Sequence, residues 1–201
     1  MISELERALA ERPLRDRWSL EGKLPGAVCL PLREHEGQVR LWAIKRPIGS
    51  RHHSGEIAFP GGKPDPEDSS LVDTALRELE EELGLDRSQV RVLGRLAPVP
   101  TATSHFYLHP FVVEVAPGAR ARPSAAEVAA LIDLSLADFY EGRLPYSAVD
   151  VGSYTSPIFD FPQGQMYGAT AHILEELLEL YAEVAGLPMP KPEAATRIPW
   201  L

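Results

Sequence analysis

The sequence predicts an α/β fold in which a mixed central sheet lies between helices. Apolar residues recur at helical spacing at 70–83 and again at 170–185, which predicts two amphipathic helices. Apolar runs of strand length lie before and between them, at 26–33, 38–45, 89–96, 106–115 and 154–161. Strands interspersed with a few helices favour a sheet that is covered by helices.

The first elements can be placed in chain order. Residues 2–11 are predicted to form a helix that is capped near Ser3. A turn through Glu36 and Gly37 is expected to join the first two strands, and a short strand is expected at 56–59. These elements lead into the central helix.

The helix at 70–83 has clear signals at both ends. Ser70 followed by Asp73 resembles a capping box, and Gly84 is a typical stop. An apolar stripe should hold the helix against the core. The stripe consists of Val72, Leu76, Leu79 and Leu83.

The second half of the chain is harder to interpret. Segment 123–134 fits either a capped helix or, over its later part, a strand. We expect one domain over residues 1–201, with a helical N-terminal extension at 1–20 and a proline-spaced C-terminal tail at 187–201.

Three carboxylates gather on one face of the central helix. Glu78, Glu81 and Glu82 stand at i, i+3 and i+4, and Arg77 is placed to orient one of them. Clustered oxygen ligands suit Mg²⁺ or Mn²⁺, which commonly bridge a protein to substrate phosphates. The acidic face lies roughly opposite the apolar stripe, so it is expected to look out of the core.

An acidic helix face can equally be a solvated surface. Like charges at i, i+4 cost only about a few tenths of a kcal/mol there. In a cleft, two carboxylates about 6 Å apart repel by roughly 3 kcal/mol at an effective dielectric near 20. A cation would then keep all three ionised, and the helix sequence alone leaves both interpretations open.

A glycine pair and a lysine lie one helix length upstream, within Phe59-Pro60-Gly61-Gly62-Lys63. A loop of this composition can bring backbone amides close to a phosphate. Together with the acidic helix, it indicates metal-dependent chemistry on a phosphate ester or anhydride.

The glycine pair and the helix together resemble the signature box of the Nudix hydrolases. Those enzymes cleave nucleoside diphosphates linked to another moiety, using divalent cations on this helix. This chain departs from the general box in two ways: Asp68 replaces the usual glutamate, and eight residues instead of seven lie between it and Arg77. The coenzyme A pyrophosphatase branch of the family shares this departure. The matching residues are Gly62, Asp68, Arg77, Glu78, Glu81, Glu82, Gly84 and Leu85.

The resemblance to that branch continues directly upstream. Its motif runs roughly LLTxR, then Ser or Ala, and then Arg, Gly and FPGG, each preceded by three variable residues. The fixed positions of this motif are matched in register by Arg46, Arg51, Gly55 and residues 59–62. Pro47 and the start Trp42-Ala43-Ile44 depart from it. Tyr167-Gly168-Ala169-Thr170-Ala171 resembles the opening of the branch's last helix, so the resemblance spans about residues 26–185.

The resemblance implies an α/β/α sandwich with a loop–helix–loop box, and a strand followed by a short helix at 135–141. It also implies hydrolysis of the pyrophosphate bond of coenzyme A or a derivative, giving 4′-phosphopantetheine and adenosine 3′,5′-bisphosphate.

The resemblance also suggests residue roles. Glu78 and Glu82 would hold the principal Mg²⁺ or Mn²⁺ ion, and Glu81 would help a second ion or a bridging water. Arg77 would orient a glutamate. The general base is open between Glu78 and a carboxylate outside the box, of which Glu127 is one candidate, although Glu127 could equally cap a helix. The loop that holds the phosphates would be shaped by Gly61, Gly62 and Lys63.

The charge distribution agrees with a small anionic substrate. The net charge of −9 argues against non-specific binding to nucleic acid or to an anionic membrane. Between residues 40 and 63 the balance reverses to +4. Coenzyme A carries a 3′-phosphate besides its pyrophosphate, so Arg46 and Arg51 are expected to bind substrate phosphates. An ordinary basic loop facing solvent is the alternative.

Three other functions stay open. A different Nudix substrate, such as ADP-ribose or a diadenosine polyphosphate, would keep the chemistry without needing the upstream arginines. A non-catalytic binding module would be expected to lose the box carboxylates, which this chain retains. An isomerase would need further acid–base groups that the sequence does not reveal.

Composition sets the outer limits. A chain of 201 residues with 44% hydrophobic content can bury a sizeable core. The single cysteine, Cys29, excludes an intramolecular disulfide. Residues 1–10 lack the features of a secretory signal, and no apolar stretch could span a bilayer, so a cytoplasmic setting is expected. The oligomeric state is open, with a homodimer as one option.

Overall fold

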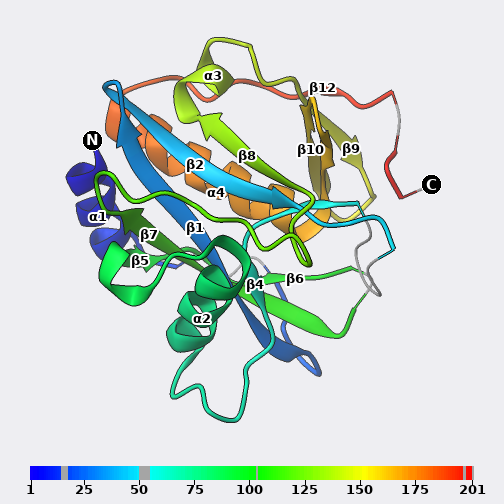
Figure 1. The fold of residues 1–201 in the computed structure, drawn as a ribbon. Helices are drawn as coiled ribbons and strands as arrows, with labels where there is room; N and C mark the ends of the chain where they lie inside the picture. The colour runs from blue at the N-terminus through cyan, green and yellow to red at the C-terminus, as the bar shows by residue number, and fades with distance from the viewer. Residues whose placement is uncertain (15–17, 50–54, 103, 197, 201) are drawn as a thin grey trace.

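The protein, seen in a computed structural model, is described over residues 1–14, 18–49, 55–102, 104–196 and 198–200. Helices cover both faces of a mixed eight-stranded sheet, and a four-stranded sheet lies beside it (Figure 1). The predicted α/β/α sandwich is therefore confirmed. The helices are α1 (Ile2–Glu11), α2 (Leu71–Leu83), α3 (Leu136–Tyr140) and α4 (Gly168–Ala185), with a 3-10 turn η1 (Arg87–Gln89).

The larger sheet is built from β1 (Leu24–His35), β2 (Gln38–Lys45), β3 (Ile57–Ala58), β4 (Gly61–Gly62), β5 (Val90–Arg95), β6 (Val99–Pro100), β7 (Phe106–Val115) and β8 (Ala130–Ser135). Its order is β3-β2-β1-β7-β5, while β4, β6 and β8 pair with β1, β7 and β2. β1 and β7 are parallel. β1 and β2 form a hairpin, in which Glu36 and Gly37 both have positive φ, as a type I′ turn requires.

The smaller sheet consists of β9 (Tyr146–Asp150), β10 (Thr155–Phe161), β11 (Gly164–Met166) and β12 (Glu193–Ala194), in the order β11-β10-β9-β12. The sequence predicted only β10. β11 and β12 are too short to show a periodicity, and β9 is half-exposed along most of its length. β12 lies beside Ser147 and Ala148, so part of the C-terminal tail adds an edge to this sheet.

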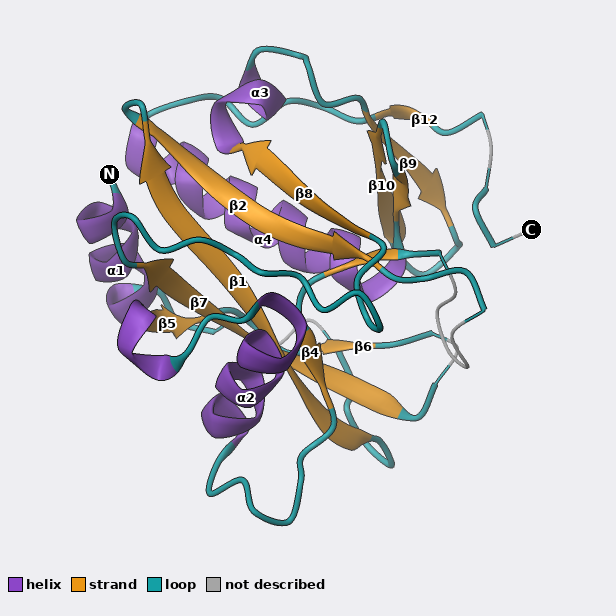
Figure 2. Cartoon of the chain, viewed as in Figure 1, coloured by secondary structure: helices purple, strands orange, loops and turns teal. Residues whose placement is uncertain are grey.

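Two hydrophobic clusters lie on opposite faces of the larger sheet. Along β1, Val28 and Leu30 belong to the cluster beneath α1 and α4, whereas Ala27 and Cys29 belong to the cluster beneath α2. Figure 2 shows α2 in front of the strands and α4 behind them. β1 is therefore buried on both sides, and it holds α2 at a defined place on the sheet.

One local expectation was wrong, and one open alternative was decided. Met1 is the N-cap of α1 and makes no side-chain cap hydrogen bond, so Ser3 is not the cap. Of the two interpretations that the sequence leaves open for segment 123–134, the strand is the one found. It begins at Ala130, and before it the carbonyl of Ser124 accepts from the amides of Glu127 and Val128 in a turn. The strand and the short helix α3 that follow agree with the family pattern.

Candidate active site

The signals at the ends of α2 act as the sequence predicted. The Asp73 amide donates to Ser70 Oγ at 3.3 Å, and that hydroxyl donates to the Asp73 carboxylate at 2.8 Å. Gly84 ends the helix in the left-handed region, at φ 65°. Leu79 and Leu83 are fully buried against the sheet. These contacts fix which side of α2 faces away from the core.

Glu82 does not look out of the core. Its side chain is only 2% exposed. Arg46 Nη1 donates to its Oε1 at 3.1 Å, and the Gly61 amide donates to its Oε2 at 3.1 Å. Burial raises the pKa of Glu82 to about 7, although the charge of Arg46 opposes the shift. The predicted outward acidic face was thus wrong for this residue, because Arg46 and β4 cover it.

Arg77 ties the acidic helix to the loop before it. Its Nε and Nη2 each donate to the Asp68 carboxylate at 3.1 Å, and Nη2 donates to the Lys63 carbonyl at 3.0 Å. Its Nη1 donates to Glu78 at 2.9 Å and to Glu81 at 3.2 Å. The bond from Arg77 lowers the pKa of Asp68 to about 2. Asp68 has no predicted role from the sequence, yet it anchors the arginine that holds both glutamates.

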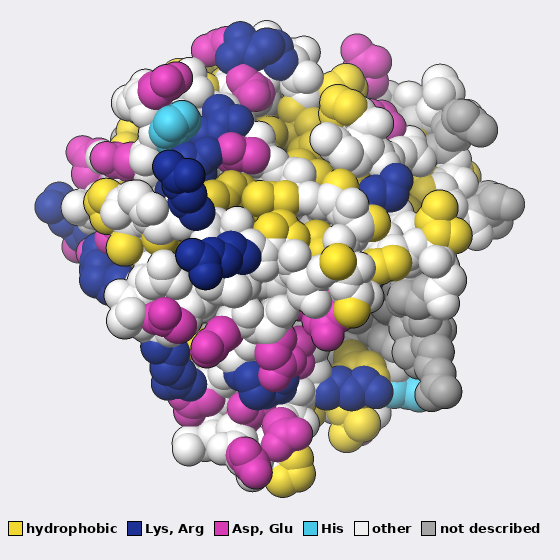
Figure 3. All heavy atoms as spheres, in the orientation of Figure 1, with side chains coloured by type: hydrophobic (Ala, Val, Ile, Leu, Met, Phe, Trp, Pro, Cys, Tyr) yellow, Lys and Arg dark blue, Asp and Glu magenta, His cyan; other side chains and the backbone are white. Residues whose placement is uncertain are grey.

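The three carboxylates of α2 differ in how far their side chains are exposed to solvent, with Glu81 the most exposed and Glu82 the least. The Glu81 side chain is 49% exposed and that of Glu78 is 16% exposed. Burial raises the pKa of Glu78, and the charges of Glu81 and Glu127 raise it further. The charge of Glu127 also raises the pKa of Glu82. Figure 3 shows acidic and basic side chains interspersed over the face that carries α2.

The glycine pair is required by close packing. A Cβ on Gly61 would lie 2.3 Å from the carbonyl oxygen of Ala27, and a Cβ on Gly62 would lie 2.4 Å from Glu78 Oε1. Both glycines form β4, and the Gly61 carbonyl also accepts from Arg46 Nη2 at 3.2 Å. The backbone of this segment therefore contacts the box glutamates directly.

Within the described part of the chain, no three acidic, histidine or cysteine side chains are grouped as a ready-made metal cage. Glu78 and Glu81 accept from Arg77, while Glu82 accepts from Arg46. Their chemistry nevertheless fits a hard divalent ion, because such ions take oxygen ligands. The raised pKa of Glu82 supports this fit, because a nearby cation would stabilise its buried charge.

A cleft of about 780 Å³ adjoins this network. One part of its wall consists of Arg46, Gly61, Gly62 and Lys63, and Lys63 Nζ lies 4.8 Å from the centre of the Phe106 ring. Another part comes from the turn between β9 and β10, from β10 itself, from α4 and from the C-terminal tail, with Val151, Tyr154, Ser156, Gly168, Ala169, Thr170, Ile173 and Trp200.

The predicted substrate-binding residues are thus partly brought together. Arg46, Gly61, Gly62 and Lys63 all line this cleft. Arg51 lies outside the described residues. Two further basic residues of the same segment are engaged elsewhere, since Arg40 contacts Asp133 at 2.9 Å and Lys45 donates to the carbonyl of Gln163.

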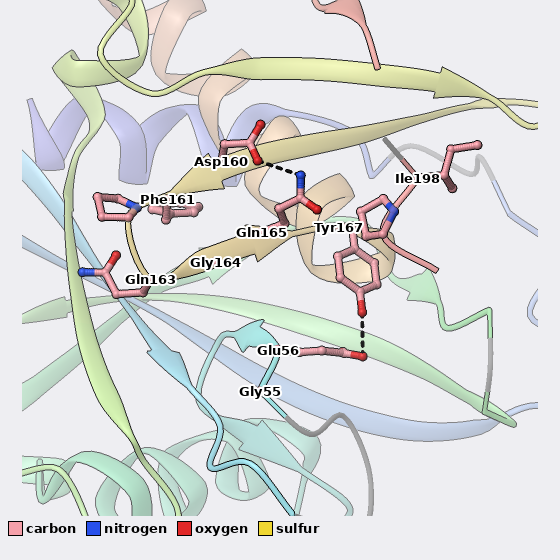
Figure 4. A pocket seen from close by; sticks show the side chains of 11 residues that line it. Gly55, Glu56, Asp160, Phe161, Gln163, Gly164, Gln165, Tyr167 and Ile198 are labelled. Carbon is pink, nitrogen blue, oxygen red and sulfur yellow. Dashed lines mark hydrogen bonds between the residues drawn. The ribbon is translucent and has the colours of Figure 1, made fainter. Parts of the chain in front are cut away.

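A second cavity of about 760 Å³ shares Glu56 and Tyr167 with the first. Figure 4 shows the Tyr167 hydroxyl pointing at Glu56, to which it donates at 2.9 Å. From the sequence, Tyr167 is predicted only to begin the segment that resembles the opening of the last helix, and neither Glu56 nor Ser156 is predicted to line a site. Glu56 is the single acidic residue of the basic segment 40–63, which could have drawn attention to it, whereas Ser156 follows no recognisable spacing.

The architecture is that of the Nudix fold. The chain is similar to the Caenorhabditis elegans Ap4A hydrolase binary complex, with a TM-score of 0.54 and 15% identity over 82% of this chain and 99% of that one. It is also similar to the Nudix domain of Shewanella oneidensis NrtR complexed with ADP-ribose, with a TM-score of 0.52 and 17% identity over 88% of this chain and 96% of that one.

The chain belongs to the Nudix family. The model of the NUDIX domain matches residues 22–150. Over 145 residues the chain is 37% identical to the uncharacterized Nudix hydrolase NudL of Yersinia enterocolitica, covering 67% of this chain and 72% of the relative. It is 34% identical to NudL of Escherichia coli over 178 residues, covering 86% and 90%. The protein is therefore a Nudix hydrolase that acts on a pyrophosphate substrate, whereas its assignment to the coenzyme A pyrophosphatase branch stays a prediction.

Proposed function

We propose that this Nudix hydrolase cleaves the pyrophosphate bond of coenzyme A or one of its derivatives, giving 4′-phosphopantetheine and adenosine 3′,5′-bisphosphate. The observation that best supports this is the contact between the two joined motifs. Arg46, from the motif upstream of the general Nudix box, donates both to Glu82 of the box and to the Gly61 carbonyl. An arginine of the upstream motif is therefore in direct contact with a candidate metal ligand of the box.

The residues that would hold Mg²⁺ or Mn²⁺ are Glu78, Glu81 and Glu82. When bound, such an ion neutralises the pyrophosphate and lowers the pKa of the attacking water. Arg77 orients Glu78 and Glu81 through its bonds to both carboxylates.

The remaining roles fall to groups around the cleft. Arg46 and Lys63 bind phosphate oxygens from the cleft wall. Glu78 or Glu127 accepts the proton of the water as its oxygen attacks phosphorus and the bond to the bridging oxygen breaks.

A hydrolysis screen tests the substrate. Free, oxidised and acylated coenzyme A, ADP-ribose and diadenosine tetraphosphate should be compared with Mg²⁺ and with Mn²⁺. We expect the highest kcat/KM for a coenzyme A form, and we expect coenzyme A to inhibit turnover of the other substrates competitively. A higher kcat/KM for ADP-ribose or the diadenosine compound, with no inhibition by coenzyme A, would contradict the proposal.

A pair of variants on one helix tests the metal-holding role. Glu82→Gln should reduce Mg²⁺-dependent turnover by at least about 100-fold, because it removes a buried carboxylate from the site. Glu80→Gln removes an exposed carboxylate of the same helix and should retain near-normal turnover. Near-normal turnover in a folded Glu82→Gln protein would remove the metal assignment.

A further inference from the structure

The wall of the cleft beyond the box contains the start of a long helix. Gly168, Ala169 and Thr170, in the first turn of α4, line the cleft, and the N-cap Tyr167 makes no side-chain cap hydrogen bond. First-turn amides have no partner within their own helix. α4 has 18 residues, so the partial positive charge of its N-terminus adds to these free donors.

A buried hydroxyl from another element faces the same space. Ser156, on β10, is 3% exposed and lines the cleft together with these helix residues. Among the residues that the structure describes, its hydroxyl makes no side-chain hydrogen bond, and it is not one of the fully enclosed side-chain atoms that lack a partner, so it is accessible from the cleft. A hydroxyl that lines the cleft without a protein partner, beside the first-turn amides of α4, is a donor available to a ligand. Glu56, which also lines the cleft, accepts the hydroxyl of Tyr167.

We propose that the N-terminus of α4 and Ser156 bind a phosphate monoester group of the substrate, separate from the pyrophosphate near Arg46 and Lys63. Backbone amides at a helix start and a serine hydroxyl supply the donors that phosphate oxygens accept. These residues lie beyond residues 22–150, where the NUDIX domain matches, so they do not belong to the shared box. The identity of the group as the 3′-phosphate of coenzyme A rests on the proposed function.

Phosphate binding can be measured without any turnover. Inorganic phosphate should be titrated into the metal-free protein while the NMR signals of the amides of residues 168–170 are followed. We expect saturable shifts at these amides in the wild type, and at least tenfold weaker binding in Ser156→Asp, which places a carboxylate beside them. Ser153→Asp adds the same charge on the exposed turn between β9 and β10, and it should bind phosphate as the wild type does.

Two results would contradict phosphate binding at the start of α4. Absence of shifts at residues 168–170 in the wild type, or equal binding by Ser156→Asp and the wild type, would overturn the proposal. Where Ser156→Asp does not fold, Ser156→Ala replaces it. We expect it to weaken phosphate binding by about three- to tenfold through the loss of one hydrogen bond to a charged group, and unchanged affinity would likewise overturn the site.

Turnover identifies the group that binds there. We expect kcat/KM for coenzyme A to exceed that for 3′-dephospho-coenzyme A by about tenfold, and this ratio to approach one in Ser156→Asp. A ratio that Ser156→Asp does not change would overturn the assignment to the 3′-phosphate. Phosphate binding without hydrolysis of either compound would leave the site standing and contradict the proposed function instead.

Discussion

At the scale of single residues, the two neighbouring glycines of β4 serve different purposes. A Cβ at position 61 would collide with the backbone of Ala27, whereas a Cβ at position 62 would collide with the carboxylate at the end of the Glu78 side chain. Gly61→Ala should therefore lower the free energy of unfolding by about 3 kcal/mol, since backbone must shift. Gly62→Ala should keep most of its stability and lose at least about tenfold in turnover, because Glu78 is displaced.

Urea unfolding and turnover of the two glycine variants separate these effects. Each variant serves as the control for the other. A stable and active Gly61→Ala protein would contradict the close packing of β4 against β1.

The raised pKa of Glu82 predicts a pH-dependent stability in the metal-free protein. Between its ordinary value of 4.5 and about 7, the folded state keeps a proton that the unfolded state has released. The contribution of Glu82 to the free energy of unfolding is therefore fully present below pH 4.5, and it falls by about 3 kcal/mol as the pH rises through 7. Urea unfolding at pH 5 and pH 8 should show this loss in the wild type relative to Glu82→Gln, which cannot titrate. Equal pH dependence in both proteins would show that the buried carboxylate carries no raised pKa.

Part of this site could be predicted from residue spacing. Helical periodicity correctly grouped Glu78 and Glu81 beside Arg77. It could not predict the burial of Glu82. Helical spacing shows on which side of the helix a residue lies, but it does not show which segments from elsewhere in the chain pack against that side. The anchoring role of Asp68 was missed for a similar reason, since it depends on the path of the loop before the helix.

At the scale of elements, the start of α2 depends on one side chain. Ser70 Oγ accepts the Asp73 amide, so Ser70→Ala should lower the free energy of unfolding by about 1 kcal/mol. Ser69→Ala, one position earlier and exposed, should leave stability within about 0.5 kcal/mol of the wild type. Thermal and urea unfolding would test this, and equal effects of the two substitutions would exclude capping by Ser70.

Elements with long and regular patterns were predictable. The helices at 2–11 and 70–83 and the strands β1, β2 and β7 lie close to their expected bounds, because their apolar residues follow one periodicity over many positions. β11 and β12 have two or three residues each and form through pairing with strands elsewhere in the chain. Short segments of this kind carry too little local preference to be recognised.

At the scale of the whole molecule, an acidic protein has a basic cleft wall. The net charge is −9, yet Arg46 and Lys63 line the cleft. An anionic substrate should therefore be attracted only by the basic residues of the cleft wall. Because salt screens this attraction, kcat/KM should fall as the salt concentration rises. The fall should be weaker in Lys63→Gln and unchanged in Lys191→Gln, which alters the exposed tail. An identical salt dependence in all three proteins would contradict a role for Lys63 in binding.

The fold class could be predicted from the sequence, but the complete cleft could not. Its second wall combines Ser156, the start of α4 and Trp200, which come together only through the packing of the smaller sheet, the last helix and the tail. No helix within the described residues is long and apolar enough to cross a membrane. The cytoplasmic setting and the homodimer stay predictions.

The central claim is that Glu78, Glu81 and Glu82 hold a divalent ion beside the cleft. Crystals of the protein soaked with Mn²⁺ test it most directly through anomalous difference density. We predict a peak between these three carboxylates, with Glu82 among the ligands. A fully ordered site without such a peak, with Glu82 still paired only to Arg46 and Gly61, would contradict the account.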